Sequence, residues 1–449
     1  MEGKKYIYEE GCASDLLCES QLSLLYASMQ ERVREDSKHK ILSLFSGCGG
    51  MDLGFEGGFI APYKSVSMRP EWIKEHINDD WVLLRSTNYK MVFANDILKE
   101  AALTWTHHMK KYGYSPFIYH TESIVDLVKQ HEAGHEIFPK DIDVVIGGFP
   151  CQDFSVAGKR KGFNSLRSHD GKKRTEELPS EENRGKLYYW MKKVIDITKP
   201  KIFIAENVKG LVNLGDVKNI IQADFARADD DGYIVFPPQV LHAGNYGVPE
   251  SRERVIFIGV KKSCLKGGLA EKMMRDEITD SLYPYPKPTH NCTLNDDTLA
   301  NPVVLRDVLK DLKEPEESKD PSQRFYSKAK FMGAHCQGQK EISLDKIGPT
   351  IRSEHHGNIE YRRLSKENGG IQEDELKRGL RERRLTPREC ALIQTFPPDY
   401  QFVMPANYNC SRFRVSSSGA YKVIGNAVPP VLAYHIAMRI QELWPVYFK

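Results

Sequence analysis

Short apolar runs alternate with amphipathic stretches along the first 260 residues of the chain. Six of these runs are bounded by turn residues and predict strands at 41–45, 91–95, 116–120, 142–147, 202–206 and 254–260. Helical periodicity fills several of the intervals, notably 97–110 and 187–198, and it returns at 429–443. Strands that alternate with helices form βαβ units, so we expect an α/β fold in which helices cover both faces of a mostly parallel sheet.

The same pattern divides the chain into parts. Apolar positions at near-helical spacing in residues 1–39 predict an N-terminal helical extension, with an arm that binds a partner or nucleic acid as the alternative. Residues 40–260 contain the strand–helix alternation and two insertions, near 59–90 and 164–182. After Val260 the alternation stops, and the charged, turn-rich stretch 261–385 predicts a smaller, irregular domain. Apolar and helical character returns from Thr386, so 386–449 is expected to pack back onto the main domain.

One cysteine lies where an α/β sheet places its reacting groups. Cys151 follows Gly147-Gly148-Phe149-Pro150, directly after the strand expected at 142–147. Ligands and reacting groups of open α/β sheets gather at the carboxyl ends of the strands. A buried structural thiol is the ordinary alternative, but two glycines, a proline and a glutamine are poor core material. We therefore interpret Cys151 as a candidate nucleophile.

Two other strand ends carry residues suited to binding or proton transfer. Phe45–Gly50 is a glycine-rich turn after the first strand, and such a turn lets a cofactor approach the backbone. Its spacing differs from the dinucleotide-binding fingerprint. Glu206 ends the strand at 202–206, and a carboxylate beside a cysteine on a neighbouring strand end is a candidate acid.

Six short motifs in this chain resemble, in the same order, those of the DNA (cytosine-5)-methyltransferases of bacterial restriction–modification systems. They are Phe45–Gly50, Phe149–Gln152, Glu206–Val208, Glu250–Arg254, Pro387–Cys390 and Gly425–Asn426, and they extend over nearly the whole chain. The resemblance implies the Rossmann-like α/β fold of S-adenosylmethionine-dependent methyltransferases. It also implies that 40–260 is the catalytic domain and that the irregular 261–385 domain recognises the target.

The resemblance implies methyl transfer from S-adenosylmethionine to carbon 5 of cytosine, with S-adenosylhomocysteine as product and no metal. Attack of a thiolate at C6 makes C5 nucleophilic, because the ring becomes an enamine. By this resemblance Cys151 is the nucleophile, Glu206 shares a proton with N3, and Arg254 with Arg252 contacts O2 and orders the site. One departure is Glu250, where the family commonly has glutamine.

The cofactor contacts of the family also correspond to residues of this chain. An acidic residue at the end of the second strand takes the ribose hydroxyls, although Asp96 could instead cap the following helix. The family often has glutamate and tryptophan where this chain has Asp96 and Ile97. The expected set is Phe45, Gly47, Cys48, Gly49, Gly50, Asp96, Ile97, Glu122, Ser123, Gly148, Pro150, Leu187, Asn426 and Ala427.

Two segments are expected to contact duplex DNA. The stretch after Cys151 resembles the family's mobile catalytic loop, which closes over a base flipped out of the helix, and its basic residues suit phosphates. Thr350-Ile351 resembles the target-recognition signature, with an ordinary turn-and-strand role as the alternative. The expected DNA contacts are Gln152, Ser155, Lys159, Arg160, Lys161, Arg184, Thr350, Ile351 and Arg352.

Composition sets further limits. The apolar share of 40% supports a buried core, and a net charge of +3 means that DNA affinity must come from local basic patches. Nine cysteines without a CxxC pair argue against a disulfide framework and a zinc site, and they fit a reducing cytosol. No signal-peptide pattern or membrane-length apolar run is found. We expect a monomeric, cytoplasmic, prokaryotic enzyme that protects DNA from a cognate restriction endonuclease. RNA cytosine methylation and a catalytically inactive DNA-binding regulator are the alternatives.

Overall fold

The computed structural model describes residues 38–150, 187–213, 216–275, 277–336, 338–353, 359–407 and 409–449. Predictions for residues 1–37, for the loop after Pro150 and for the 164–182 insertion lie outside these ranges. So do the predictions for Cys151, Gln152, Ser155, Lys159, Arg160, Lys161 and Arg184.

The main sheet has the strand order β10-β11-β8-β7-β1-β5-β6, with β9 beside β11, and β1 (His39–Leu44) lies between β7 and β5. The other strands are β5 (Tyr89–Asn95), β6 (Tyr119–His120), β7 (Val144–Gly148), β8 (Ile202–Val208), β9 (Tyr233–Val235), β10 (Gln239–His242) and β11 (Glu253–Lys261). From β8 to β6 the neighbouring strands are parallel, whereas β11 is antiparallel to β8. The predicted mostly parallel α/β sheet is confirmed. The run at 116–120 is a strand only in its last two residues, because a 3₁₀ turn starts at Pro116.

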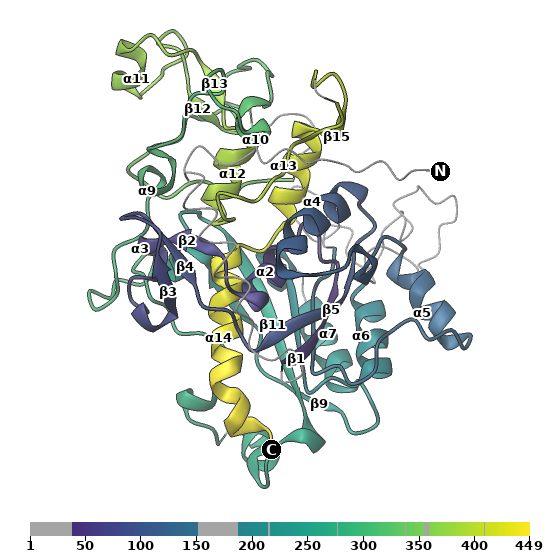
Figure 1. Cartoon of the computed structure of the whole chain (residues 1–449). Coiled ribbons are helices and arrows are strands. Elements are labelled where there is room, and N and C mark those ends of the chain that lie inside the picture. The colour runs from purple at the N-terminus through teal and green to yellow at the C-terminus, as the bar shows by residue number, and fades with distance from the viewer. Residues whose placement is uncertain are drawn as a thin grey trace, which may run out of the picture.

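Apolar layers cover both faces of this sheet, since successive side chains of a strand point to opposite faces. Ile41 of β1 packs in the layer that contains α2 (Gly50–Glu56), α4 (Lys99–Met109) and α14 (Pro430–Tyr447). Leu42 and Leu44 pack in the layer that contains α5 (Ile124–Glu132), α6 (Leu187–Thr198) and α7 (Val217–Ala226). Figure 1 shows α14 on one side of the sheet and α5, α6 and α7 on the other. Burial on both faces explains why the parallel strands are continuous apolar runs.

The stretch 59–90 forms a small antiparallel sheet of its own. Its strands are β2 (Ile60–Pro62), β3 (Ile73–His76) and β4 (Trp81–Leu84), in the order β2-β4-β3, and α3 (Tyr63–Val66) follows β2. Trp72 and Trp81 are buried in the same layer as α14. The stretch is therefore folded against the layer that contains α14.

Residues 261–385 contain short elements joined by long irregular connections. These elements are α8 (Leu269–Met274), α9 (Leu305–Leu309), α10 (Pro321–Arg324), β12 (Tyr361–Arg363), α11 (Glu373–Lys377) and β13 (Arg383–Arg384). Figure 1 shows α10, α11, β12 and β13 gathered together at the top, away from the main sheet. Residues at the start of this stretch lie elsewhere, because Leu265 pairs with Phe448 at the end of α14.

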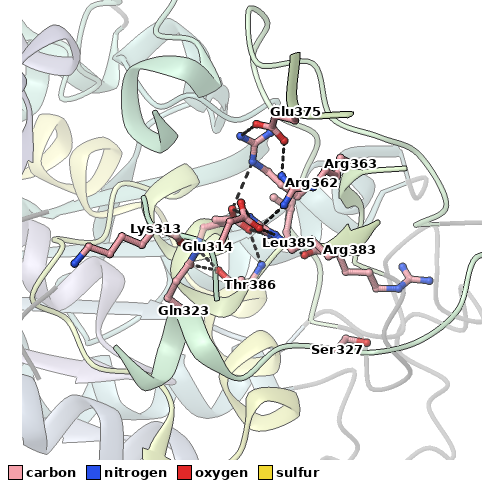
Figure 2. A network of polar contacts seen from close by, with 12 residues as sticks. Lys313, Glu314, Gln323, Ser327, Arg362, Arg363, Glu375, Arg383, Leu385 and Thr386 are labelled. Atoms are coloured by element: carbon pink, nitrogen blue, oxygen red, sulfur yellow. Dashed lines mark hydrogen bonds and ion pairs between the residues drawn. The ribbon is translucent and has the colours of Figure 1, made fainter. Parts of the chain in front are cut away.

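Buried ion pairs hold the β12–β13 pair of strands in place (Figure 2). Arg383 donates to Glu314 at 2.9 Å and to Glu389 at 2.8 Å, and Arg363 also bonds to Glu314. Glu389 belongs to α12 (Pro387–Ile393) and also accepts the N–H of Thr386 at 2.8 Å, which completes a capping box. One carboxylate therefore caps α12 and anchors β13.

The last part of the chain joins the main sheet to the region that contains β12 and β13. After α12 come β14 (Met404–Pro405), β15 (Phe413–Val415), α13 (Ser417–Asn426) and α14. The backbones of α2 and α14 touch, because a Cβ on Gly54 would lie 2.7 Å from the Tyr434 nitrogen. The C-terminal helices thus pack beside the turn that follows β1.

Candidate active site

Strand register brings Glu206 and Arg254 together. Glu206 of β8 lies opposite Ile256 of β11, and Arg254 lies two residues before Ile256, on the same face of the sheet. Nε of Arg254 is 2.7 Å from Oε1 of Glu206, and the two side chains are 11% and 9% exposed. Because β11 is antiparallel to β8, it begins at the edge where β8 ends. These two predicted catalytic residues therefore form an ion pair at the carboxyl edge of the sheet.

The end of β7 lies against the same carboxylate. Gly148 pairs with Glu206 across the parallel strands, and a Cβ on Gly148 would come within 2.6 Å of Oε2 of Glu206. Nδ2 of Asn207 donates to the Phe149 carbonyl at 3.0 Å. The chain is thus fixed beside Glu206 just before Pro150, which Cys151 follows in the sequence. Asn207 was not predicted as a site residue, although it lies in the Glu206–Val208 motif.

Glu206 has the electrostatics that a proton donor needs. Burial raises the pKa of its carboxyl above the ordinary value of 4.5, while the nearby Arg254 and Arg252 act in the opposite direction. The protonated form is therefore more populated than in an exposed glutamate at the same pH.

Arg252 faces the protein interior. Its side chain is fully buried, and its Nη1 donates to the Ile351 carbonyl at 3.0 Å. Its Nη2 donates to the carbonyls of Gly425 at 2.8 Å and Ala427 at 2.6 Å. The predicted contact of Arg252 with a cytosine is therefore wrong in this structure, because the guanidinium is used on backbone carbonyls. The other member of the predicted arginine pair, Arg254, reaches the site.

The glycine-rich turn after β1 leaves space beside Gly47. Gly47 has a φ of 56°, a conformation that favours glycine, and its N–H donates to Oδ2 of Asp96 at 3.1 Å. A Cβ on Gly47 would meet no atom of the described residues within 4 Å. A Cβ on Gly49 would meet Trp105 at 2.6 Å, and one on Gly50 would meet a backbone oxygen at 2.1 Å. Packing within the protein therefore requires Gly49 and Gly50, whereas Gly47 leaves room for a ligand.

Cys48 points away from that space. Its fully buried thiol donates to the Val423 carbonyl at 3.3 Å, and the Tyr400 hydroxyl donates to the Cys48 carbonyl. Burial raises the pKa of this thiol, which keeps it neutral. The Cys48 side chain therefore packs against α13, and the expected contact of Cys48 with the cofactor stays a prediction.

A chain of hydrogen bonds joins the ends of β1, β5 and β6. The Ser46 N–H donates to the Asn95 carbonyl at 2.8 Å, and the Asn95 N–H donates to the Ser46 hydroxyl at 3.2 Å. Nδ2 of Asn95 donates to the Glu122 carbonyl at 2.8 Å. Asp96 contributes to the same edge and also accepts the N–H of Leu98 at 2.9 Å, just before α4. Ser46 and Asn95, which were not predicted, thus fix the three strand ends expected to hold the cofactor.

The remaining predicted cofactor residues surround this turn. Phe45 adopts a φ of 53° and is partly buried against the layer of α5 and α6. Three residues are exposed enough for side-chain contact with a ligand: Ile97 at 45%, Glu122 and Asn426. Three others are buried, so only a small part of each is accessible: Ser123, Leu187 and Ala427.

A second carboxylate, Asp52, stabilises the glycine-rich turn through Ser43 and Trp105. Asp52 of α2 is fully buried, and it accepts the Ser43 hydroxyl at 2.6 Å and Nε1 of Trp105 at 2.7 Å. Burial raises its pKa to about 6. The same Trp105 ring lies against Gly49. Asp52 was not predicted as a site residue. The only hint in the sequence was an acidic residue in the first turn of a mostly apolar helix, α2.

Three residues predicted to contact DNA, Thr350, Ile351 and Arg352, differ in exposure. Ile351 is 1% exposed, and its N–H donates to Oε1 of Glu250 at 2.6 Å. A groove contact by Ile351 is therefore wrong in this structure. The Thr350 hydroxyl donates to the Ser251 carbonyl, and Arg352 is 30% exposed, with Nη2 3.8 Å from Glu360. Thr350 and Arg352 remain accessible from solvent.

A cavity of about 560 Å³ lies at the opposite edge of the sheet, near the amino ends of β1, β7 and β8. Four lysines and two aspartates line it, and the aspartates are already paired, since Lys201 is 2.9 Å from Asp143 and Lys40 is 3.9 Å from Asp141. Reacting groups of parallel sheets lie at the carboxyl ends of the strands. We therefore place the active site at the Glu206 edge.

No group of three or more potential metal-ligating side chains is found among the described residues. Within the same part of the chain, no helix is long and apolar enough to cross a membrane.

Comparison with known proteins gives consistent matches over most of the chain. Residues 39–442 match the family model described as C-5 cytosine-specific DNA methylase. The type II methyltransferase M.BsuRI of Bacillus subtilis is 31% identical over 422 residues, which cover 92% of this chain and 81% of the relative. M.BspRI of Lysinibacillus sphaericus is also 31% identical, over 92% of this chain and 84% of the relative.

Two solved structures share the fold. The S. pombe Dnmt2 methyltransferase aligns with 90% of this chain and 99% of its own, at a TM-score of 0.50 and 16% identity. The Entamoeba histolytica methyltransferase EhMeth aligns with 91% of this chain and 99% of its own, at a TM-score of 0.51 and 14% identity.

Proposed function

Because the chain belongs to the C-5 cytosine-specific DNA methylase family, we propose that it methylates carbon 5 of a cytosine flipped out of a specific duplex DNA sequence. The family match and the type II relatives make it a DNA (cytosine-5) methyltransferase. The observation that carries the proposed mechanism is the Glu206–Arg254 ion pair beside the end of β7, because the sequence continues from there into Pro150 and Cys151.

Cys151 is the proposed nucleophile. Its thiolate adds to C6 of the cytosine, which makes C5 nucleophilic, and C5 then takes the methyl group. Loss of the C5 proton and departure of the Cys151 sulfur give 5-methylcytosine. Asn207 contributes by fixing the Phe149 carbonyl, so that the peptide that precedes the nucleophile is held at the sheet edge.

Glu206 and Arg254 are proposed to stabilise the charge that develops on the ring. Glu206 in its protonated form donates to N3, and the raised pKa of this carboxyl supports that role. Arg254 holds the Glu206 side chain from one side and donates to O2 of the base. This assignment leaves Arg252 out of the group that touches the base.

S-adenosylmethionine is the proposed cofactor, and when bound it supplies an electrophilic methyl group. The open space beside Gly47 and the exposed Ile97, Glu122 and Asn426 fit such a ligand. Asp96 would accept the ribose hydroxyls, because each of its oxygens makes one hydrogen bond to a backbone N–H and retains further acceptor capacity.

Target recognition is proposed for residues 261–385. Within them, a basic loop at 328–336 exposes Lys328 and Lys330. Buried Arg384 orders the backbone of this loop by donating to the Ala329 carbonyl at 2.9 Å and to the Gly338 carbonyl at 2.8 Å. A pre-ordered basic loop suits phosphate contact. Arg352 is the proposed contact to a base edge.

We further propose that the enzyme acts as a monomer in the cytoplasm of a prokaryote. Methylation would protect its target sequence from a cognate restriction endonuclease, since both bacterial relatives described above are type II methyltransferases.

Bisulfite sequencing of DNA from cells that express the protein tests this proposal. We expect cytosines within one short motif to resist conversion, and we expect no resistance with Cys151→Ala. Uniform conversion in cells that express the folded wild-type protein would contradict the proposal. Methyl transfer to transfer RNA but not to duplex DNA would favour the RNA alternative.

A further inference from the structure

Three segments that are far apart in the sequence meet at Arg252. The first is Pro249–Arg252, which leads into β11. The second is Gly348–Ser353, the recognition segment. The third is Gly425–Ala427, the cofactor segment, which contains the exposed Asn426. Nη1 of Arg252 binds the recognition segment at Ile351, and its Nη2 binds the cofactor segment at Gly425 and Ala427.

Glu250 and Arg252 together hold both polar groups of the Ile351 backbone. Oε1 of Glu250 accepts the Ile351 N–H at 2.6 Å, and Arg252 donates to the Ile351 carbonyl at 3.0 Å. Backbone hydrogen bonds extend the contact, since the Ser251 N–H donates to the Gly348 carbonyl at 2.8 Å. The recognition segment therefore lies along Pro249–Arg252, just before β11, with a parallel bridge between Gly348 and Glu250.

The recognition and cofactor segments also touch directly. A Cβ on Gly425 would lie 2.2 Å from the carbonyl carbon of Arg352 and 2.3 Å from the nitrogen of Ser353. Only glycine allows this approach of the two backbones. A displacement of the recognition segment must therefore move Gly425, and with it the neighbouring Asn426.

Stability alone does not explain the Glu250–Arg252 pair. Both side chains are fully buried and their nearest charged atoms are 3.4 Å apart. Oε2 of Glu250 and Nε of Arg252 have no hydrogen-bond partner among the described residues. Buried polar atoms without partners are destabilising, and apolar replacements of buried ion pairs are often more stable. A polar pair at this junction therefore suggests a role in function.

We propose that Glu250 and Arg252 are positioning residues that couple DNA binding at the recognition segment to cofactor binding at the cofactor segment. The inference rests on the proposed function, because it takes DNA and S-adenosylmethionine as the two ligands. In this proposal DNA orders the recognition segment and S-adenosylmethionine orders the cofactor segment. Because one guanidinium is bonded to both segments, ordering of either one favours the ordered position of the other. By thermodynamic linkage, DNA then increases cofactor affinity by the same factor as cofactor increases DNA affinity.

The quantity to measure is the coupling factor, which is the cofactor Kd without DNA divided by the cofactor Kd with DNA. Isothermal titration gives the Kd of S-adenosylhomocysteine for the full-length protein, with and without a short duplex that carries the motif identified by bisulfite sequencing. For the wild type we expect the duplex to lower this Kd by a factor within the range of roughly 5 to 150 that is typical of coupled sites. In Arg252→Lys a single ammonium cannot reach three carbonyls, so the factor should fall to about one.

Two variants of Glu250 separate a specific role from general loss of structure. The Glu250→Gln amide still accepts the Ile351 N–H, so it should retain most of the coupling, whereas Glu250→Ala should lose it. The matched control is Arg388→Lys, since Arg388 is also buried, but its hydrogen bonds go to Asp320 at 2.6 Å and to the Pro397 carbonyl, and neither partner lies in the two segments. This control should be less stable than the wild type and yet show the same coupling factor.

Three results would overturn the inference: a wild-type factor of one, an unchanged factor in Arg252→Lys and Glu250→Ala, or an equal loss in Arg388→Lys. Failure of the wild type to bind either ligand would count against the proposed function instead.

Discussion

At the scale of single residues, the site depends on one carboxyl group in an unusual setting. Glu206 is buried beside Arg254, at 2.7 Å, and yet its pKa is raised, because burial outweighs the attraction of the two nearby arginines. A general acid must carry its proton when the reaction begins. Removal of the carboxyl from water favours the protonated form that the proposed role needs, whereas Arg254 and Arg252 act in the opposite direction.

Replacement of Glu206 by glutamine should slow the chemical step by roughly 10²- to 10⁴-fold. The amide can donate a hydrogen bond to N3 but cannot transfer a proton. In the wild type, the single-turnover rate should fall as pH rises through the raised pKa of Glu206, because the proton-donating form is lost. The glutamine variant should lack that decrease, and single-turnover methylation across a pH series measures both effects. A rate loss of less than about threefold would mean that Glu206 is structural.

Replacement of Asp96 by alanine should weaken cofactor binding by roughly 10- to 100-fold, the range expected for the loss of a charged hydrogen-bond acceptor. Asp96 directly follows β5, where the proposal places the ribose hydroxyls, and it accepts the Gly47 N–H at 3.1 Å. Asp96→Asn is the matched variant, since it keeps one acceptor for the turn. Titration with S-adenosylhomocysteine makes the comparison, and equal affinity in all three proteins would move the cofactor site elsewhere.

At the scale of elements, the sequence was most informative where one physical signal dominates. The parallel strands are buried on both faces, so their apolar runs predicted them directly. Their carboxyl ends predicted the edge of the sheet at which Glu206 and Asp96 lie, on separate strands. Contacts between distant segments leave no such signal. The motif that contains Arg252 does not reveal that its guanidinium faces Ile351 and Gly425 instead of a substrate.

The short strands β12 and β13 were missed for a related reason. Apart from Tyr361, their buried residues are arginines, such as Arg383 with its partners Glu314 and Glu389, so they lack the apolar signal of a buried strand. Ile351 shows the converse error. A resemblance placed it in a DNA groove, whereas its apolar side chain belongs to the core.

Arg383→Met should lower the free energy of unfolding by about 3–5 kcal/mol, because it leaves the buried Glu389 carboxylate without its main partner. The comparison variant is Lys140→Met, which breaks an ion pair with Glu136 in which both side chains are about 80% exposed. That change should have no measurable effect on stability. Urea unfolding followed by circular dichroism gives both values. Equal midpoints for Arg383→Met and the wild type would show that the buried network does not stabilise the fold.

At the scale of the whole molecule, reaction and recognition are assigned to different regions that share a boundary. The carboxyl edge of the main sheet collects the groups proposed to act on the base and the cofactor. Residues 261–385 add the basic loop at 328–336 and the recognition segment, and α12 and α13 connect the two regions.

Replacement of both Lys328 and Lys330 by alanine should weaken binding to all duplexes alike and leave the methylated motif unchanged. Loss of two phosphate contacts should reduce the dependence of log affinity on log salt concentration by about 2. Lys272 of α8, which lies near the C-terminal end of α14, is the control, and its replacement should leave the salt dependence unchanged. Binding titrations at several salt concentrations test this, and an altered motif would mean that the loop reads bases.

The proposed reaction depends most on the nucleophile that follows β7, and covalent trapping tests it directly. Duplex DNA with 5-fluorocytosine at the target position, incubated with the enzyme and S-adenosylmethionine, should form a stable adduct, because fluorine cannot leave as a proton does. Peptide mapping by mass spectrometry should place the DNA on Cys151, and Cys151→Ala should form no adduct. An adduct on another cysteine, or normal methylation of unmodified duplex without any trapping, would contradict the account.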